Sequence, residues 1–334
     1  MLDDLIGFII FILIFVVEYQ KDNNLRGMEM IKLDNMVENV LGFFTEKPKR
    51  DVALVLSTGG ARGLAHIGAI YELMEEGFHI TSIAGTSMGA LIGGMYAAGR
   101  LDDYKEWMKT IDKRKIRSLI DIKLGRNSFV KGDRIINAMK EIVPDVRIED
   151  MQIPYRAVAT DVITGKEVIF TKGSLYEAIR ASISMPGFYE PVRYDNKVLV
   201  DGGLSNPLPL NRVKRSKKDL LVAVDVSGHN YQAQLQFQHE VRKLEREKIP
   251  LMSLIGKLGL SSDEDEMNLI SLLNRSFSIS IHHNALTMLK LLPPDIYVGI
   301  PMTRYTTFDF DKAERLEAIG RNYMRKAIEK YRDQ

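Results

Sequence analysis

Two short strand patterns, each followed by a glycine-rich turn and a helix pattern, constrain the fold of this chain more than any other feature. Val52–Leu56 is a continuous apolar run, and Ile80–Ala84 is the second predicted strand. Helices are predicted at Leu64–Glu76 and Met88–Ala98, directly after the two turns. Short continuous apolar runs are typical of buried parallel strands. The pattern therefore predicts a strand–helix–strand–helix unit with a right-handed crossover.

Strands and helices alternate through the rest of the chain as well. Further strands are predicted at residues 155–160, 167–170, 197–200, 220–226 and 295–300. Further helices are predicted at residues 107–113, 133–142, 176–182 and 313–331. This alternation predicts an α/β fold of three layers, α/β/α, with a mostly parallel central sheet covered on both faces. The 334 residues, 45% of them hydrophobic, suffice for one large domain of this class.

Changes in composition divide the chain into four predicted regions. Residues 1–27 contain a hydrophobic segment, and residues 28–50 form a linker in which Pro48 stops any helix. Residues 51–228 form the main domain. Residues 229–334 form a C-terminal extension that begins with a highly charged insertion and packs on the same domain.

The hydrophobic segment bears on the localisation of the chain. Leu5–Val17 is apolar apart from one glycine, and as a helix it would span about 20 Å, less than the roughly 30 Å of a bilayer core. Asp3 and Asp4 precede it where a secretory signal would carry basic residues. Two interpretations stay open: a short membrane anchor, or a true translation start downstream at Met28 or Met30. We expect a cytoplasmic protein, or one associated with a membrane through this segment, without a clear signal for secretion.

Composition excludes several kinds of chemistry. The chain has no cysteine, so disulfides, Cys-ligated zinc and a thiol nucleophile are ruled out. Covalent catalysis would have to use Ser, Thr, Lys, Asp or His. The 46 basic and 44 acidic residues give a net charge of +2, so no charge excess favours nucleic acid as a partner.

The first glycine-rich turn, Ser57–Gly63, lies between the first predicted strand and helix. Its glycines permit a sharp turn that directs N–H groups toward an anion at a helix N-terminus. A mononucleotide site would need Gly-Lys-Ser/Thr here, and a dinucleotide site would need an acidic residue at the end of the next strand. Both signals are missing. An oxyanion hole for acyl transfer and a simple tight turn remain.

The second turn has the sequence Gly85-Thr86-Ser87-Met88-Gly89 and matches the G-x-S-x-G pattern. It follows a predicted strand and begins a helix of small residues, which is the setting that exposes a serine hydroxyl on a strained turn. Gly85 and Gly89 avoid the collisions that Cβ atoms would cause there. Because one strand–helix–strand unit separates the two turns, we expect both at the same edge of the sheet.

A serine nucleophile needs a base. No histidine has a supporting motif; the six are at positions 66, 79, 229, 239, 282 and 283. Asp201 is a different candidate, because it ends the predicted strand and is followed by Gly202 and Gly203. An Asp-Gly pair is also typical of an ordinary turn, so both interpretations stay open here.

Together, the Gly59–Gly63, Gly85–Gly89 and Asp201–Gly203 blocks resemble the patatin-like phospholipase family, in its bacterial type. The resemblance covers roughly residues 52–228. Further blocks that support it are Arg180-Ala181-Ser182, Met185-Pro186-Gly187-Phe188 and Val224-Asp225-Val226. It implies a patatin-like catalytic domain at residues 51–228 that hydrolyses acyl esters of lipids through an acyl-enzyme, without metal or cofactor.

The resemblance also implies the roles of individual residues. Ser87 would be the nucleophile and Asp201 the general base. The backbone N–H groups of the predicted oxyanion hole would come from Gly59, Gly60 and Ala61, with Arg62 and Gly63 completing the turn. The partner would be a lipid or acyl-ester substrate. By its own composition, the basic and apolar segment 113–120 could touch an anionic lipid surface, but a solvated face beside core positions is the favoured interpretation.

One position departs from the family pattern, and two other functions stay open. The family usually has three consecutive glycines where this chain has Thr58 before Gly59. A threonine would be strained there if the position needs a positive φ. The first alternative is an α/β-hydrolase with a Ser-Asp-His triad that uses His282 or His283. The second is a binding protein on the same fold, with Thr58 as the mark of lost catalysis.

Overall fold

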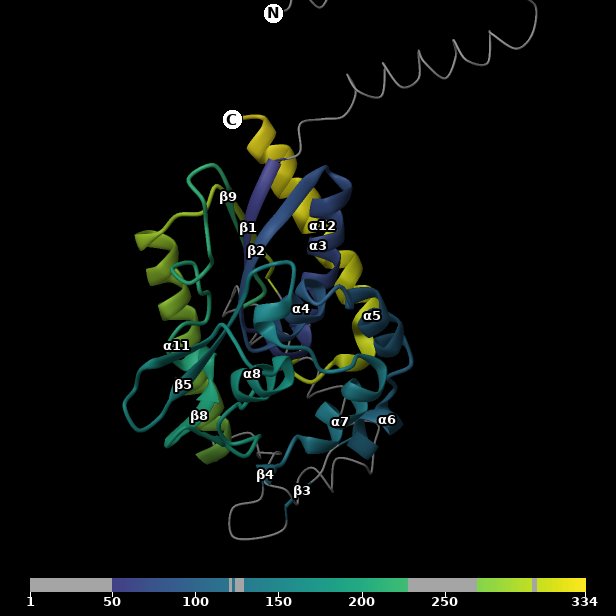
Figure 1. The fold of residues 1–334 in the computed structure, drawn as a ribbon, viewed down its shortest axis with the longest axis vertical. Coiled ribbons are helices and arrows are strands. Elements are labelled where there is room, and N and C mark those ends of the chain that lie inside the picture. Colours follow the sequence, from purple (N-terminus) through teal and green to yellow (C-terminus); the bar gives the residue numbers. More distant parts are fainter. Residues whose placement is uncertain (1–49, 120–121, 124–128, 228–268, 302–304) are drawn as a thin grey trace, which may run out of the picture. The chain divides into compact units, whose positions relative to one another are not determined.

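A central eight-stranded sheet organises the computed structural model of this protein (Figure 1). The structure describes residues 50–119, 122–123, 129–227, 269–301 and 305–334. The strands of the sheet are β1 (Arg50–Leu56), β2 (Phe78–Thr86), β5 (Tyr155–Asp161), β6 (Glu167–Phe170), β7 (Val192–Tyr194), β8 (Lys197–Asp201), β9 (Leu220–Asp225) and β10 (Ile296–Gly299). A separate two-stranded sheet pairs β3 (Ile122–Lys123) with β4 (Phe129–Val130).

The sheet is parallel in one part and antiparallel in the other. Its order is β10-β9-β1-β2-β5-β8-β7, and β6 also pairs with β5. All pairs from β10 to β5 are parallel. The pairs β5–β6, β5–β8 and β7–β8 are antiparallel. The mostly parallel α/β sheet predicted from the sequence is confirmed, with an antiparallel edge that the alternation of elements did not indicate.

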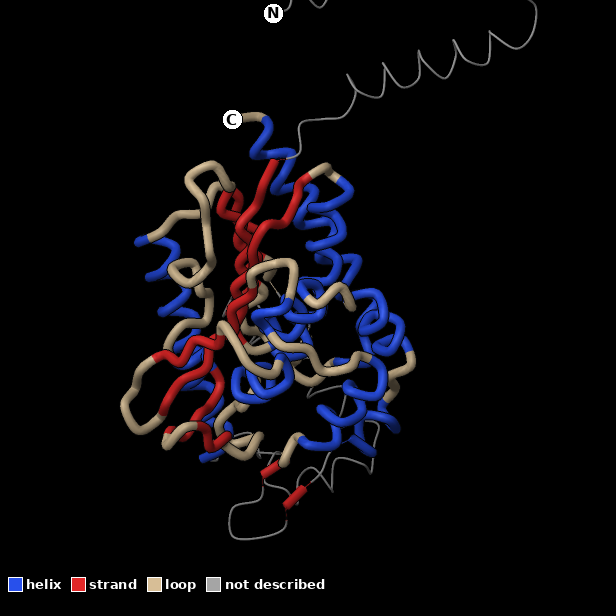
Figure 2. Tube along the Cα trace, in the orientation of Figure 1, coloured by secondary structure: helices blue, strands red, loops and turns tan. Residues whose placement is uncertain are grey.

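Helices cover both faces of the sheet (Figure 2). They are α3 (Ala65–Glu75), α4 (Met88–Ala97), α5 (Leu101–Lys109), α6 (Lys113–Leu119), α7 (Asp133–Ile142), α8 (Leu175–Ser182), α11 (Leu269–Leu291) and α12 (Ala313–Arg332). Alternate side chains of β1 enter two cores. Val52, Leu54 and Leu56 pack with α3, α4 and α12, whereas Ala53 and Val55 pack with α11 and with Leu208 and Leu210. This confirms the predicted three layers.

The helix predicted at residues 107–113 is wrong. Helix α5 starts at Leu101 and ends at Lys109, and α6 begins at Lys113. Asp102 and Asp103 lie in the first turn of α5, where acidic side chains stabilise the positive end of the helix dipole. The helix therefore begins before the predicted range.

The localisation predicted from residues 1–27 is also wrong. Across the described residues, no helix combines the length and the apolar content needed to cross a bilayer. Leu5–Val17, on which the prediction depended, lies outside the described residues.

Residues 50–334 form one compact unit. Strand β10 extends the sheet beside β9, and α12 packs along α3, so elements from the C-terminal region share the layers of the main domain. We propose on this basis that regions 51–228 and 229–334 fold together. The predicted segment 1–27 and nearly all of the linker 28–50 lie outside the described residues, as does most of the charged insertion.

Helices α3 and α12 approach each other through glycine. A Cβ atom on Gly68 would lie 1.9 Å from the carbonyl oxygen of Glu317, and one on Gly320 would lie 1.9 Å from that of Ala65. Buried Glu72 accepts two hydrogen bonds from the Arg325 guanidinium, at 2.6 and 3.1 Å. The contact holds α12 against the helix that follows the first glycine-rich turn.

We expect Gly320→Ala to destabilise the protein, although alanine normally stabilises a helix by about 1 kcal/mol relative to glycine. The added methyl group must displace backbone, and overpacking of this kind costs about 1–3 kcal/mol. Urea unfolding monitored by circular dichroism measures the change. Asn322→Ala, at an exposed position of the same helix, is the control and should leave stability equal or higher. A stabilised Gly320→Ala protein would contradict the close packing of α3 and α12.

Candidate functional site

The two glycine-rich turns lie side by side at one edge of the sheet. Strands β1 and β2 are parallel, and Leu56 at the end of β1 pairs with Gly85 near the end of β2. The chain leaves both strands toward the same edge, as predicted. A Cβ atom on Gly89 would lie 2.3 Å from the carbonyl oxygen of Leu56. Glycine is therefore required where the second turn packs against the end of β1.

Ser87 occupies a strained position between β2 and α4. Its φ of 56° and ψ of −120° lie outside the helical and strand regions, and a residue held in such a region costs about 1–3 kcal/mol. The side chain is 7% exposed. Its backbone N–H donates to the Ser182 hydroxyl at 2.8 Å, which satisfies one of the unpaired donors at the start of α4.

Asp201 lies directly beside Ser87. The Ser87 hydroxyl donates to Oδ2 of Asp201 at 2.6 Å, although 114 positions separate the two residues. The Gly203 N–H donates to Oδ1 at 2.7 Å, so both carboxylate oxygens are held. Strand β8, which ends at Asp201, reaches this place because it pairs with β5, the neighbour of β2. The structure thus joins the two residues that sequence patterns singled out separately.

The surroundings of Asp201 make it a stronger base than an ordinary carboxylate. Its side chain is 2% exposed. Burial raises the pKa of Asp201 from about 3.8 to about 6, while the hydrogen bonds from Ser87 and Gly203 act in the opposite direction. Near neutral pH the group is still mostly ionised, yet its proton affinity is higher than that of a solvated aspartate.

Thr58 is not strained. The described non-glycine residues with positive φ are Ser87, Asp195 and Asn196, and Thr58 is not among them. Its N–H donates to the carbonyl of Pro207 at 2.9 Å. The positive φ of the turn, 57°, belongs to Gly60 instead. The departure from three consecutive glycines therefore falls at a position where this backbone accepts a side chain.

The three predicted oxyanion donors differ in availability. None of the described residues accepts a hydrogen bond from the N–H groups of Gly59 or Gly60. The Ala61 N–H, in contrast, donates to the Thr307 carbonyl at 2.8 Å. Thr307 also covers Gly60, where a Cβ atom would lie 2.1 Å from the Thr307 methyl carbon. A segment far along the chain thus occupies one of the three predicted donors.

Arg62 and His66 fix the turn from within. The Arg62 Nε–H donates to the Gly59 carbonyl at 3.0 Å, and His66 Nε2 lies 2.9 Å from the Ser57 carbonyl. Since a carbonyl only accepts, Nε2 carries the proton. Burial lowers the pKa of His66 to about 4, so the ring is neutral at physiological pH. Gly63, which is buried, completes the turn just before α3 begins.

No histidine completes a triad within the described part of the chain. The hydroxyl of Ser87 and the carboxylate of Asp201 bond to each other and to backbone, not to an imidazole. His282 and His283 lie on α11, and His79 pairs with Asp51 at 2.9 Å. The other two histidines, at positions 229 and 239, lie outside the described residues.

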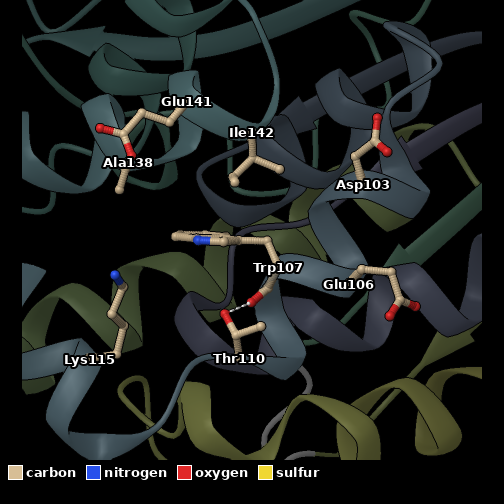
Figure 3. Close-up of a pocket in the computed structure, with 8 residues that line it drawn as sticks. All are labelled: Asp103, Glu106, Trp107, Thr110, Lys115, Ala138, Glu141 and Ile142. Atoms are coloured by element: carbon tan, nitrogen blue, oxygen red, sulfur yellow. Dashed lines mark hydrogen bonds between the residues drawn. The ribbon is translucent and has the colours of Figure 1, made fainter.

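A pocket of about 520 Å³ lies apart from these residues (Figure 3). Trp107 and Ile142 contribute its apolar surface, beside charged side chains from α5, α6 and α7. It contains none of the predicted site residues, so we assign it no role in the site. Among the described residues, no group of three or more His, Asp or Glu side chains is arranged to hold a metal ion.

Sequence patterns did not identify two contributors to the site. Ser182 belongs to a block that supported the family resemblance, but no role was predicted for it. Thr307 acts through a backbone carbonyl, which any residue could supply. Only the position of Ser182 within a matching block could have drawn attention to it.

Comparison with known proteins identifies a matching family. Residues 54–213 match the family model described as Patatin-like phospholipase. The resemblance predicted over roughly residues 52–228 is thereby confirmed for this range.

Individual relatives are similar over different parts of the chain. An uncharacterized NTE family protein of Mycobacterium bovis is 46% identical over 177 residues, which are 53% of this chain and 49% of the relative. Lysophospholipase NTE1 of Saccharomyces cerevisiae is 27% identical over 282 residues, 82% of this chain and 16% of that protein. This chain thus spans about half the length of the mycobacterial relative and far less of the yeast protein. Among solved structures, VipD from Legionella pneumophila matches with a TM-score of 0.44 and 14% identity, over 85% of this chain and 67% of VipD.

The neutral, buried His66 should make stability depend on pH. An unfolded histidine has a pKa of about 6.5, so between that value and about 4 the unfolded chain binds the extra proton. Stability that is fully present above pH 6.5 is then lost as the pH falls, by about 3 kcal/mol at pH 4. His66→Gln retains a donor for Ser57 but does not titrate.

Urea unfolding of both proteins between pH 4 and 8 provides the measurement. The difference between them removes the contributions of other titrating groups, including Asp201. We expect wild type to lose its advantage over His66→Gln as the pH falls. A difference that stays constant over this range would show that His66 does not titrate in this way.

Proposed function

We propose that this chain, whose residues 54–213 match the patatin-like phospholipase family model, is a serine lipid acyl hydrolase with a Ser87–Asp201 dyad. One observation carries the proposal: a serine on a strained strand–helix turn donates a 2.6 Å hydrogen bond to a buried aspartate. A short hydrogen bond between nucleophile and base is what proton removal from a serine hydroxyl requires.

In the proposed reaction, the Ser87 oxygen attacks the carbonyl carbon of an acyl ester while Oδ2 of Asp201 takes its proton. The tetrahedral intermediate collapses, the C–O bond to the alcohol breaks, and Asp201 returns the proton to the leaving oxygen. A water molecule then attacks the acyl-enzyme, with Asp201 again as the base. The fatty acid leaves and the Ser87 hydroxyl is restored.

The N–H groups of Gly59 and Gly60 are the donors that we assign to the oxyanion. They lie on the turn that packs against the nucleophile elbow, the Gly85–Gly89 turn, and no described residue accepts a hydrogen bond from them. One oxyanion donor contributes about 3 kcal/mol to the lowering of the barrier. Ala61 can contribute only when its N–H is released by the Thr307 carbonyl. The proposed hole therefore depends mainly on the two glycines.

Lysophospholipids are the substrate class that we propose. The relatives that match most of this chain include lysophospholipase NTE1 of Saccharomyces cerevisiae and the patatin-like phospholipase domain-containing protein 7 of Rattus norvegicus. The rat protein is 26% identical over 80% of this chain, which covers 20% of it. A lipid with one acyl chain, presented in micelles, is accordingly the first substrate to test.

The two alternative functions have less support. A triad would need a histidine at the dyad, whereas Asp201 itself accepts the hydrogen bond of the serine hydroxyl. The binding-protein hypothesis relied on a strained Thr58, and the backbone at that position is not strained.

We expect Ser87→Ala to abolish hydrolysis of nitrophenyl butyrate and of lysophosphatidylcholine micelles, together with labelling by a fluorophosphonate probe. Asp201→Asn should lower the rate of both hydrolysis and labelling by about 10³-fold, since general-base catalysis contributes about 10²–10⁴-fold. A variant with His282→Ala and His283→Ala is the control and should keep wild-type activity. Loss of activity in that control with full activity in Asp201→Asn would establish the triad instead.

The pH dependence of kcat/KM should report Asp201. Its carboxylate must be ionised to accept the serine proton, and its pKa is raised to about 6. We expect kcat/KM to be level above that pH and to fall about tenfold per pH unit below it. Circular dichroism at each pH separates this effect from unfolding. A profile that stays level down to pH 4.5 would contradict Asp201 as the base.

A further inference from the structure

The block Arg180-Ala181-Ser182 at the end of α8 has no part in the proposed reaction, yet it contacts the dyad. Ser182 is completely buried. Its hydroxyl accepts the backbone N–H of Ser87 at 2.8 Å and donates to the Val158 carbonyl at 2.6 Å. The Ser182 hydroxyl therefore both accepts and donates a hydrogen bond, and these two bonds fix its orientation.

We infer that Ser182 is a positioning residue that holds the nucleophile Ser87 at the geometry required for attack. The inference rests on the proposed function and adds a residue to it. Ser182 is completely buried and bonds to the backbone of Ser87, not to its hydroxyl oxygen. It acts through the backbone of Ser87, which adopts a conformation with positive φ that must be held in place by its surroundings.

The second partner of Ser182 extends this role toward Asp201. Val158 lies on β5 and pairs with Thr86, the residue before the nucleophile. The Val158 carbonyl also packs against the turn after Asp201, because a Cβ atom on Gly202 would lie 2.2 Å from it. The Ser182 hydroxyl thus ties the backbone of the nucleophile to the strand that supports the base.

The segment that follows α8 contacts Asp201 as well. The carbonyl of Ser184 accepts the backbone N–H of Asp201 at 2.9 Å. Arg180 stabilises this segment, because its guanidinium donates to the Ser184 hydroxyl at 2.6 Å and to the Glu190 carbonyl at 2.9 Å. Residues 182–184 therefore fix the backbones of Ser87 and Asp201 relative to each other.

Removal of the hydroxyl would leave the buried Ser87 N–H without its acceptor and would take one hydrogen bond from the Val158 carbonyl. The elbow could then relax, and a displacement of the nucleophile by about 1 Å can cost on the order of 10²-fold in rate. Substrate binding would be unaffected because Ser182 does not contact the substrate. The loss should accordingly appear in kcat and in acylation, with KM unchanged.

The experiment compares Ser182→Ala with Ser82→Ala in the full-length chain. Ser82 is also buried and also donates to a backbone carbonyl, that of Lys214, but it lies in β2 away from Ser87. For both variants, kcat and KM for nitrophenyl butyrate, the rate of fluorophosphonate labelling and the melting temperature are measured. We expect Ser182→Ala to lower kcat and the labelling rate by 10- to 100-fold at unchanged KM. Ser82→Ala should lose stability only.

The pH profile provides a readout that a merely structural role would not move. The hydrogen bond from Ser87 lowers the pKa of Asp201. If Ser182→Ala loosens that hydrogen bond, the midpoint of kcat/KM should move to higher pH, and in Ser82→Ala it should stay at the wild-type value.

Ser182→Cys keeps the experiment decisive if the alanine variant does not fold. A thiol is a weak donor and a weak acceptor, so we expect a folded protein with kcat between those of wild type and the alanine variant. Wild-type kcat in Ser182→Cys, or equal losses of kcat in Ser182→Ala and Ser82→Ala, would overturn the inference. Absence of labelling at Ser87 in the wild-type protein would instead overturn the proposed function.

Discussion

The parallel pairing of β1 with β2 is the constraint on which the site depends. It brings two turns that follow different strands to one edge, and it does so with so little space that Gly89 packs onto the carbonyl of Leu56. No side chain fits between them. The donors of the first turn and the hydroxyl of the second therefore lie on neighbouring backbones, and a change in either strand would alter both.

Burial gives the site its chemistry at the expense of stability. At neutral pH Asp201 carries a charge in a place where burial disfavours charge, and the two hydrogen bonds that it accepts offset only part of this cost. The strained backbone of Ser87 adds a further cost. The close packing of α3 on α12 and the hydrogen bonds from the exposed Arg325 to the buried Glu72 support the helix that follows the first turn.

Parts of this structure that a single local pattern determines can be predicted from the amino-acid sequence. The elbow and the strand exit at Asp201 are such patterns, and the sequence alone indicates both. The start of α5 was missed although the buried Leu101, Tyr104 and Met108 are spaced as on one face of a helix and two acidic residues lie in its first turn. Ser182 was missed as well. Its hydroxyl meets a backbone N–H that is 95 positions away in sequence. Neither partner of a side-chain-to-backbone contact across that distance leaves a pattern that marks the pairing.

The contact between Thr307 and Ala61 illustrates how such backbone contacts affect chemistry. The Thr307 carbonyl is a neutral acceptor on a turn that, in the proposed mechanism, must stabilise an anion. A substrate carbonyl in the ground state would gain little by replacing it, since one neutral hydrogen bond would be exchanged for another. An oxyanion would gain more, because hydrogen bonds to charged acceptors are roughly twice as strong. Replacement of the Thr307 carbonyl by the oxyanion as the acceptor of the Ala61 N–H would therefore stabilise the transition state more than the bound substrate. An interaction must do this in order to raise kcat.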